Sequence, residues 1–156
     1  MSYQEVKGDL IELAKEGSFD VIVHGCNCFC TMGAGIAPQM AQAFGADKFP
    51  LEKAEYKGAI NKLGMIDSHL VGNVVVANAY TQYGFGANHE GGSKMPLDYQ
   101  ALILCLKKLN HTYEGKKIGL PQIGCGLAGG DWDIVKGLIQ KHMKNVEVTV
   151  VIYQPF

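Results

Sequence analysis

The chain has 156 residues, and its 14 basic side chains nearly balance 15 acidic ones, giving a formal net charge of −1. This length predicts a single domain spanning residues 1–156, because a second domain would be too small to bury its own core. The near-neutral charge excludes the strongly basic surface with which proteins bind nucleic acids or acidic membranes non-specifically. Any anionic ligand must therefore be bound by local groups.

Apolar segments alternate with segments of helical spacing along the chain. Four segments rich in β-branched residues are predicted to be strands covered on both faces, residues 21–24, 74–78, 118–121 and 148–153. Four others are predicted to be helices, residues 38–44, 47–63, 98–110 and 131–144. The alternation predicts an α/β fold, a three-layer sandwich with a largely parallel central sheet.

Two of the predicted helices begin after an aspartate that can cap them. Asp98 precedes a helix whose apolar positions fall on one face, namely Ala101, Leu102, Cys105, Leu106 and Leu109. Asp131 precedes a helix whose core-facing residues are predicted to be Ile134, Val135, Leu138 and Ile139.

Two glycine-rich loops each connect a predicted strand to a predicted helix. The first spans residues 26–37 and contains Gly33 and Gly35, and the second, residues 124–130, reads GCGLAGG. Glycine allows backbone conformations in which consecutive N–H groups point at an anion, and a helix N-terminus adds to the attraction. The pair predicts a ligand with two phosphates held from both sides. Either loop alone could be only a tight turn.

All basic residues are lysines, since the sequence contains no arginine. The guanidinium that binds phosphate through two parallel hydrogen bonds is therefore missing. A bound phosphate would have to be held by backbone N–H groups, by a lysine, or by both. A cysteine phosphatase mechanism needs an arginine six positions after the nucleophile, and Met32 occupies that position after Cys26.

The five cysteines raise the question of a metal site. The Cys-x-Cys-x-Cys run at positions 26–30 lacks the gap of roughly two to four residues that zinc ligands need. We therefore expect no metal and no cofactor, and we interpret the cysteines as packing residues. Their odd number, and the lack of a recognisable leader, predict a reduced, cytoplasmic protein. No apolar run could span a bilayer, so no membrane partner is expected.

Two polar residues beside the first loop are candidates for catalysis. His24 ends a predicted strand, so its imidazole could reach a ligand and exchange a proton near neutral pH, or it could be a hydrogen-bonded core residue. Asn27 could cap the turn or orient a ribose hydroxyl.

Together these segments resemble the macrodomain family, whose members bind ADP-ribose. The resemblance covers KGDL (7–10), HGCNCFCTMGAGIA (24–37), LPQIGCGLAGGDW (120–132) and TVVIYQ (149–154), in order along nearly the whole chain. It implies an α/β/α sandwich with a mixed sheet, and ADP-ribose or a 1″-substituted ADP-ribose as the ligand. An ADP-ribosylated protein or nucleic acid is an alternative partner, and the chain is expected to be a monomer.

The resemblance implies a role for most residues of the site. Asp9 would accept a hydrogen bond from the adenine amino group beside the Leu10 backbone, Tyr153 would wall the adenine pocket, and Asn27 would contact the distal ribose. The two loops would enclose the diphosphate, which adds to the site Met32, Gly33, Ala34, Gly35, Ile36, Ala37, Gly124, Cys125, Gly126 and Leu127.

The motifs are most similar to the ADP-ribose-1″-phosphate phosphatase branch of the family. There the histidine that matches His24 is a proposed catalytic residue. We therefore predict hydrolysis of the 1″-phosphate, with His24, Asn27 and Asp131 as the catalytic residues. Asp131 could instead be only a helix cap.

Two alternative functions stay open. One is release of ADP-ribose from an acetyl group, a protein carboxylate or a nucleic-acid base. The related glycohydrolases use a lysine where this chain has Gln82, and some use an aspartate where it has Ala128. Only Lys94, beside the glycine-rich segment 83–93 that we expect to be a surface loop, could replace the lysine. The other alternative is a binding module without enzymatic activity.

Overall fold

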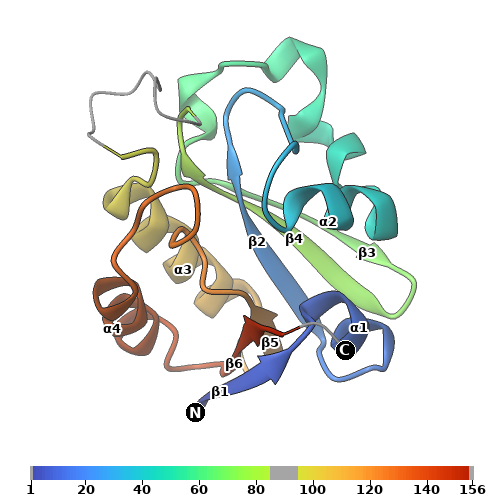
Figure 1. The fold of residues 1–156 in the computed structure, drawn as a ribbon, viewed down its shortest axis with the longest axis vertical. Helices are drawn as coiled ribbons and strands as arrows, with labels where there is room; N and C mark the ends of the chain where they lie inside the picture. The colour runs from blue at the N-terminus through green and yellow to red at the C-terminus, as the bar shows by residue number, and fades with distance from the viewer. Residues whose placement is uncertain (1, 85–94, 155–156) are drawn as a thin grey trace.

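The computed structural model describes residues 2–84 and 95–154. Within these residues a six-stranded sheet runs through the middle of the molecule (Figure 1). The strands lie in the order β1-β6-β5-β2-β4-β3, and every neighbouring pair is parallel except β3 and β4. The predicted mixed, largely parallel sheet is confirmed. Its strands are β1 (Tyr3–Gly8), β2 (Val21–Asn27), β3 (Ile66–Val71), β4 (Val74–Gln82), β5 (Lys117–Leu120) and β6 (Glu147–Tyr153).

Helices cover both faces of the sheet, as Figure 1 shows. Helices α1 and α2 pack against one face together with Ile22, whereas α3 and α4 pack against the other together with Val23. Successive strand residues point to opposite faces, so β2 contributes to two cores and the predicted three-layer sandwich is confirmed. None of the described helices is long and apolar enough to cross a membrane. The helices are α1 (Leu10–Lys15), α2 (Ala37–Phe44), α3 (Tyr99–Thr112) and α4 (Trp132–His142).

Aspartates cap the two longest helices as predicted. The Asp98 side chain accepts a hydrogen bond from the Ala101 N–H at 3.0 Å, and Asp131 accepts one from the Asp133 N–H at 2.9 Å. All five apolar residues predicted for the inner face of α3 are buried. In α4, Val135 and Ile139 are buried as predicted, but the prediction for Ile134 is wrong, because this side chain is 48% exposed.

The helix predicted at residues 47–63 is wrong. The segment forms four short 3₁₀ turns, η1 (Ala46–Lys48), η2 (Pro50–Glu52), η3 (Ala54–Tyr56) and η4 (Ile60–Lys62). Pro50 cannot donate an intrahelical hydrogen bond and holds the preceding residue extended. Gly58 then interrupts the chain with φ of +76°. We call residues 46–62 the 3₁₀ segment.

Three elements, β1, β3 and α1, were not predicted from the sequence. Strands β1 and β3 are the two edges of the sheet. Most of their residues are partly or fully exposed, and neither strand contains a continuous apolar run. Helix α1 has only six residues, too few to show a helical period.

Candidate functional site

A cavity of about 880 Å³ lies at the carboxyl ends of the parallel strands, where open α/β sheets bind their ligands. This volume is in the range of small-molecule sites. The start of α1, the two glycine-rich loops and the end of β6 all contribute to its wall. Every residue predicted to bind the ligand lines it, namely Asp9, Leu10, Asn27, Met32, Gly33, Ala34, Gly35, Ile36, Ala37, Gly124, Cys125, Gly126, Leu127 and Tyr153.

Asn27 holds the first glycine-rich loop in shape. Its Oδ1 accepts hydrogen bonds from the Phe29 N–H at 2.9 Å and the Thr31 hydroxyl at 3.1 Å, and its Nδ2 donates to the Thr31 carbonyl at 3.0 Å. The loop leads into α2, whose first turn has no side-chain cap. Because the first N–H groups of a helix lack intrahelical partners, this end of α2 presents donors at the cavity wall.

The second glycine-rich loop closes tightly on itself. The Gly130 N–H donates to the Gly124 carbonyl at 2.8 Å, and a Cβ on Gly130 would lie 2.6 Å from that oxygen. Gly124 has φ of +75°, and a Cβ there would lie 2.7 Å from Leu97 Cδ1. Glycine is therefore required at both ends of the loop, since any side chain would force the backbone or Leu97 to move.

Asp9 carries the one charged side chain among the described residues that line the cavity. One of its carboxylate oxygens, Oδ1, accepts the N–H groups of Ile11 at 2.9 Å and Glu12 at 3.1 Å and thereby caps α1. The other oxygen has no hydrogen-bond partner in residues 2–84 or 95–154. No lysine lines this described wall, so donors for a phosphate there must come from the backbone or from neutral side chains.

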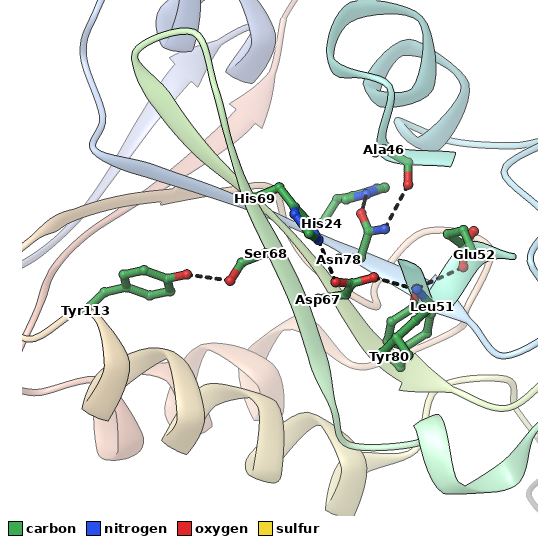
Figure 2. Close-up of polar contacts among 10 residues, drawn as sticks. All are labelled: His24, Ala46, Leu51, Glu52, Asp67, Ser68, His69, Asn78, Tyr80 and Tyr113. Atoms are coloured by element: carbon green, nitrogen blue, oxygen red, sulfur yellow. Dashed lines mark hydrogen bonds and ion pairs between the residues drawn. The ribbon is translucent and has the colours of Figure 1, made fainter. Parts of the chain in front are cut away.

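His24 does not line the cavity, so the structure does not support its predicted catalytic role. The side chain is fully buried, and its Nε2 lies 2.7 Å from Asn78 Oδ1 (Figure 2). Asn78 Nδ2 donates to the Ala46 carbonyl at 3.0 Å, which orients the amide so that Oδ1 accepts from His24. Burial lowers the pKa of His24 to about 4, so the imidazole is neutral at pH 7. Through Asn78, the hydrogen bonds of His24 connect β2 with β4 and with Ala46 of the 3₁₀ segment.

Asp131, the other predicted catalytic acid, lies outside the cavity as well. Its side chain is exposed, and its cap bond to the Asp133 N–H accounts for its position at the start of α4. Its own N–H donates to the Tyr99 hydroxyl at 3.0 Å. The structure therefore supports the interpretation of Asp131 as a helix cap.

The thiols near the cavity are poor nucleophiles at neutral pH. Burial raises the pKa of Cys26 well above its ordinary value, and raises the pKa of Cys28 and of Cys125 to about 11. A thiol attacks as its thiolate, so these groups stay in the unreactive form. Within the described residues, no group of three or more His, Cys, Asp or Glu side chains is arranged to hold a metal ion.

Several neutral residues of the wall were not predicted to bind the ligand. Thr31, Gln82 and Gln122 line the cavity, and Gln82, named from the sequence only as the residue in place of a catalytic lysine, pairs with Asn27 in the register of β4 and β2. Their signal was positional, because each lies at or just beyond the carboxyl end of a parallel strand. Lys94 and most of segment 83–93 lie outside the described residues.

Comparison with known proteins identifies the family and agrees with the fold. Residues 23–139 match the family described as Macro domain. The chain belongs to the macrodomain family. This macrodomain is 35% identical to an uncharacterized 17.5 kDa protein in the tk-vs intergenic region of Enterobacteria phage T4, with 99% of each chain covered.

Other similar proteins have names that indicate function. The macrodomain is 24% identical to an ADP-ribose 1″-phosphate phosphatase of Saccharomyces cerevisiae, covering 93% of this chain and 95% of that protein. Its structure is similar to the macrodomain of Thermus aquaticus DarG, with a TM-score of 0.70, 25% identity and 98% of each chain covered. The family includes ADP-ribose-binding proteins and hydrolases.

We expect Gly124→Ala to weaken ADP-ribose binding at least tenfold and to destabilise the macrodomain by about 1 to 3 kcal/mol, because the methyl group collides with Leu97 at a positive φ. Titration calorimetry and urea unfolding measure the two effects. Gly137→Ala is the matched control, since open space surrounds this glycine of α4 and alanine favours a helix. Unchanged affinity in Gly124→Ala would contradict the importance of the loop.

The pKa of His24 predicts a pH dependence of stability. Its folded-state pKa of about 4 lies below the ordinary value of 6.5. Between these two values His24 is protonated in the unfolded chain but not in the folded protein. The free energy of unfolding therefore decreases as the pH falls from about 6.5 to about 4. The loss reaches roughly 3 kcal/mol near pH 4. Urea unfolding of His24→Gln should show a flatter pH dependence than wild type.

The exposed His111 provides the control for that measurement, because His111→Gln should keep the wild-type pH profile. Identical profiles for His24→Gln and wild type would show that His24 is not held neutral by burial.

Proposed function

We propose that this macrodomain binds ADP-ribose conjugates in the cavity and hydrolyses ADP-ribose-1″-phosphate to ADP-ribose and phosphate. The observation that carries the proposal is the pair of glycine-rich loops, which line one cavity together with Asp9. Nearly full-length similarity to a protein named as an ADP-ribose 1″-phosphate phosphatase supports the choice of substrate.

In the proposed complex, adenine occupies the end of the cavity formed by Asp9, the Leu10 backbone and Tyr153. The diphosphate lies between the two loops and accepts hydrogen bonds from the backbone N–H groups of residues 33–37 and 124–127. The distal ribose then lies toward Asn27, with its 1″ substituent near Thr31 and Gln82. All of these residues line the cavity, and their uncharged donors suit a ligand whose phosphates need many weak contacts.

Water would attack the phosphorus of the 1″-phosphate, and the bond between phosphorus and the ribose oxygen would break. The described wall offers no histidine or lysine to this step. The contribution of the protein would therefore be to orient the phosphate and to stabilise the charge on its oxygens with fixed N–H donors. Because the described wall places no general acid or base at the 1″-phosphate, we expect slow turnover.

Binding without turnover is the second candidate, and one observation favours it. Asp9 is the one carboxylate among the described residues that line the cavity, and in this proposal it lies at the adenine end, away from the 1″ substituent. Release of ADP-ribose from protein or nucleic acid through a lysine receives less support, because Gln82 cannot form a Schiff base.

A panel of ADP-ribose conjugates tests these functions. Purified protein is incubated with ADP-ribose-1″-phosphate, an ADP-ribosylated glutamate peptide and ADP-ribosylated DNA, and products are measured by mass spectrometry. We expect phosphate release from the first substrate alone. Tight ADP-ribose binding without turnover of any conjugate would establish the binding module. A folded protein that binds no ADP-ribose would contradict both functions.

Asp9→Asn should weaken ADP-ribose binding by about tenfold to a hundredfold with little loss of stability. The remaining Oδ1 can still accept the Ile11 and Glu12 N–H groups, whereas the second oxygen becomes an NH₂ group that cannot accept from the adenine amino group. Calorimetry measures the affinity, and urea unfolding measures the stability.

Asp98→Asn is the matched control, because Asp98 also caps a helix through Oδ1 but does not line the cavity. Equal ADP-ribose affinity in the Asp9 and Asp98 variants would contradict the assignment of Asp9 to adenine.

A further inference from the structure

Lys62, at the end of the 3₁₀ segment, is an unusual buried cation. Lys62 is only 1% exposed, and its ammonium nitrogen donates a hydrogen bond to the Leu51 carbonyl at 3.0 Å. The same nitrogen lies 3.3 Å from Cys30 Sγ and 4.9 Å from the centre of the Tyr80 ring. Its charge interacts with the Glu52 carboxylate, but no carboxylate of the described residues lies close enough to form an ion pair with it. Lysine is rarely this buried without a paired carboxylate, so the thiol is an unusual neighbour.

Cys30 is held against this nitrogen by the first glycine-rich loop. Its backbone has φ of +59°, and the thiol rests on the 3₁₀ segment, with Sγ 3.6 Å from the carbonyl oxygens of both Leu51 and Lys53. Cys30 is partly exposed, whereas Cys26 and Cys28 beside it in the sequence are buried. A small oxidant from solvent can therefore reach Cys30 before it reaches the other two thiols.

We propose that Cys30 and Lys62 are a modification site at which a peroxide forms a covalent sulfur–nitrogen bridge. The contact of 3.3 Å between Sγ and Nζ carries the proposal. The proposal concerns a covalent reaction of the free protein, so it stands or fails separately from ADP-ribose binding.

The chemistry needs one equivalent of peroxide and two steps. First the thiol attacks the O–O bond, which oxidises sulfur to the sulfenic acid Cys–SOH and reduces the peroxide to water or an alcohol. Lys62 then loses a proton to solvent, and its amine nitrogen attacks the sulfur and displaces hydroxide. The sum of these events is that Cys–SOH with Lys–NH₃⁺ gives Cys–S–NH–Lys, water and a proton. The four-carbon stem of lysine is flexible enough to close the remaining distance. Two equivalents of a thiol reductant cleave the bridge. They restore the free thiol of Cys30 and the free amine of Lys62, and they are oxidised to one disulfide.

The bridge would join the cavity wall to the 3₁₀ segment. Cys30 directly precedes Thr31 and Met32, which both line the cavity, and Lys62 is held on the segment through Leu51. Peroxide would thereby replace a hydrogen bond to the base of the first loop with a covalent bond.

The test is peptide mapping of the wild-type protein after treatment with a small excess of hydrogen peroxide. We expect a cross-linked peptide pair joining Cys30 to Lys62, lighter than the sum of its peptides by about 2 Da, the mass of two hydrogens. Dithiothreitol should restore both free peptides. Oxidised protein in which Cys30 forms a disulfide or a higher acid, with Lys62 unmodified, would overturn the proposal.

Variants sharpen the result. Cys30→Ser and Lys62→Met should both lose the link, and Lys62→Met should instead accumulate a sulfenic acid at Cys30 that dimedone traps. Cys125→Ser is the matched control, because Cys125 is also a partly exposed loop thiol but has no lysine contact among the described residues. It should keep the link. Should Lys62→Met fail to fold, the wild-type map alone still decides between the two outcomes.

Discussion

A cavity whose described wall contains no basic side chain can hold a diphosphate only through backbone N–H groups and neutral donors, so the shape of two loops decides what binds. This constraint explains why glycine occupies both ends of the second loop, where a side chain would meet Leu97 or the Gly124 carbonyl. It also explains the heavy use of Asn27 within the first loop, because a loop that serves as the binding group must be held in one conformation before the ligand arrives.

Polar side chains attach the irregular 3₁₀ segment to the sheet, as Figure 2 shows. Asp67 of β3 accepts the Leu51 N–H at 2.8 Å, and the Tyr80 hydroxyl of β4 donates to Glu52 at 2.8 Å. Short 3₁₀ turns leave backbone groups without regular partners and offer little apolar surface, so buried side chains must supply the attachment. Glu52 is buried in this attachment, and burial raises the pKa of its carboxyl group. His24 belongs to this network through Asn78.

The parts of the fold that follow from local rules were predictable from the sequence. Covered parallel strands appear as β-branched runs, and Asp98 announces α3 because a capping side chain acts on its own helix. The edge strands β1 and β3 escaped notice, since a strand with an exposed face contains no apolar run. A helix was wrongly predicted at residues 47–63 because the apolar spacing there is helical, whereas Pro50 and Gly58 prevent a continuous helix.

In the candidate site, the meeting of the two glycine-rich loops could be predicted from the sequence, whereas the orientation of the predicted catalytic side chain His24 could not. Glycine-rich loops at the carboxyl ends of parallel strands must meet at one edge, so sequence order alone brings their residues together. The direction of the His24 side chain depends on the residue with which its imidazole forms a hydrogen bond. That residue, Asn78, lies 54 positions away in the sequence. No local pattern contains that information.

The two oxygens of Asp9 have separate environments, one facing the backbone of α1 and the other left over at the cavity. Under the proposed assignment of Asp9 to adenine, few residues at this position suit a redesign of the scaffold for a different nucleobase. Asparagine, serine and threonine can keep the helix start intact while presenting a different hydrogen-bonding group to the base. Larger side chains would alter base selection only by sacrificing the first turn of α1, so new specificities are best sought among these three residues.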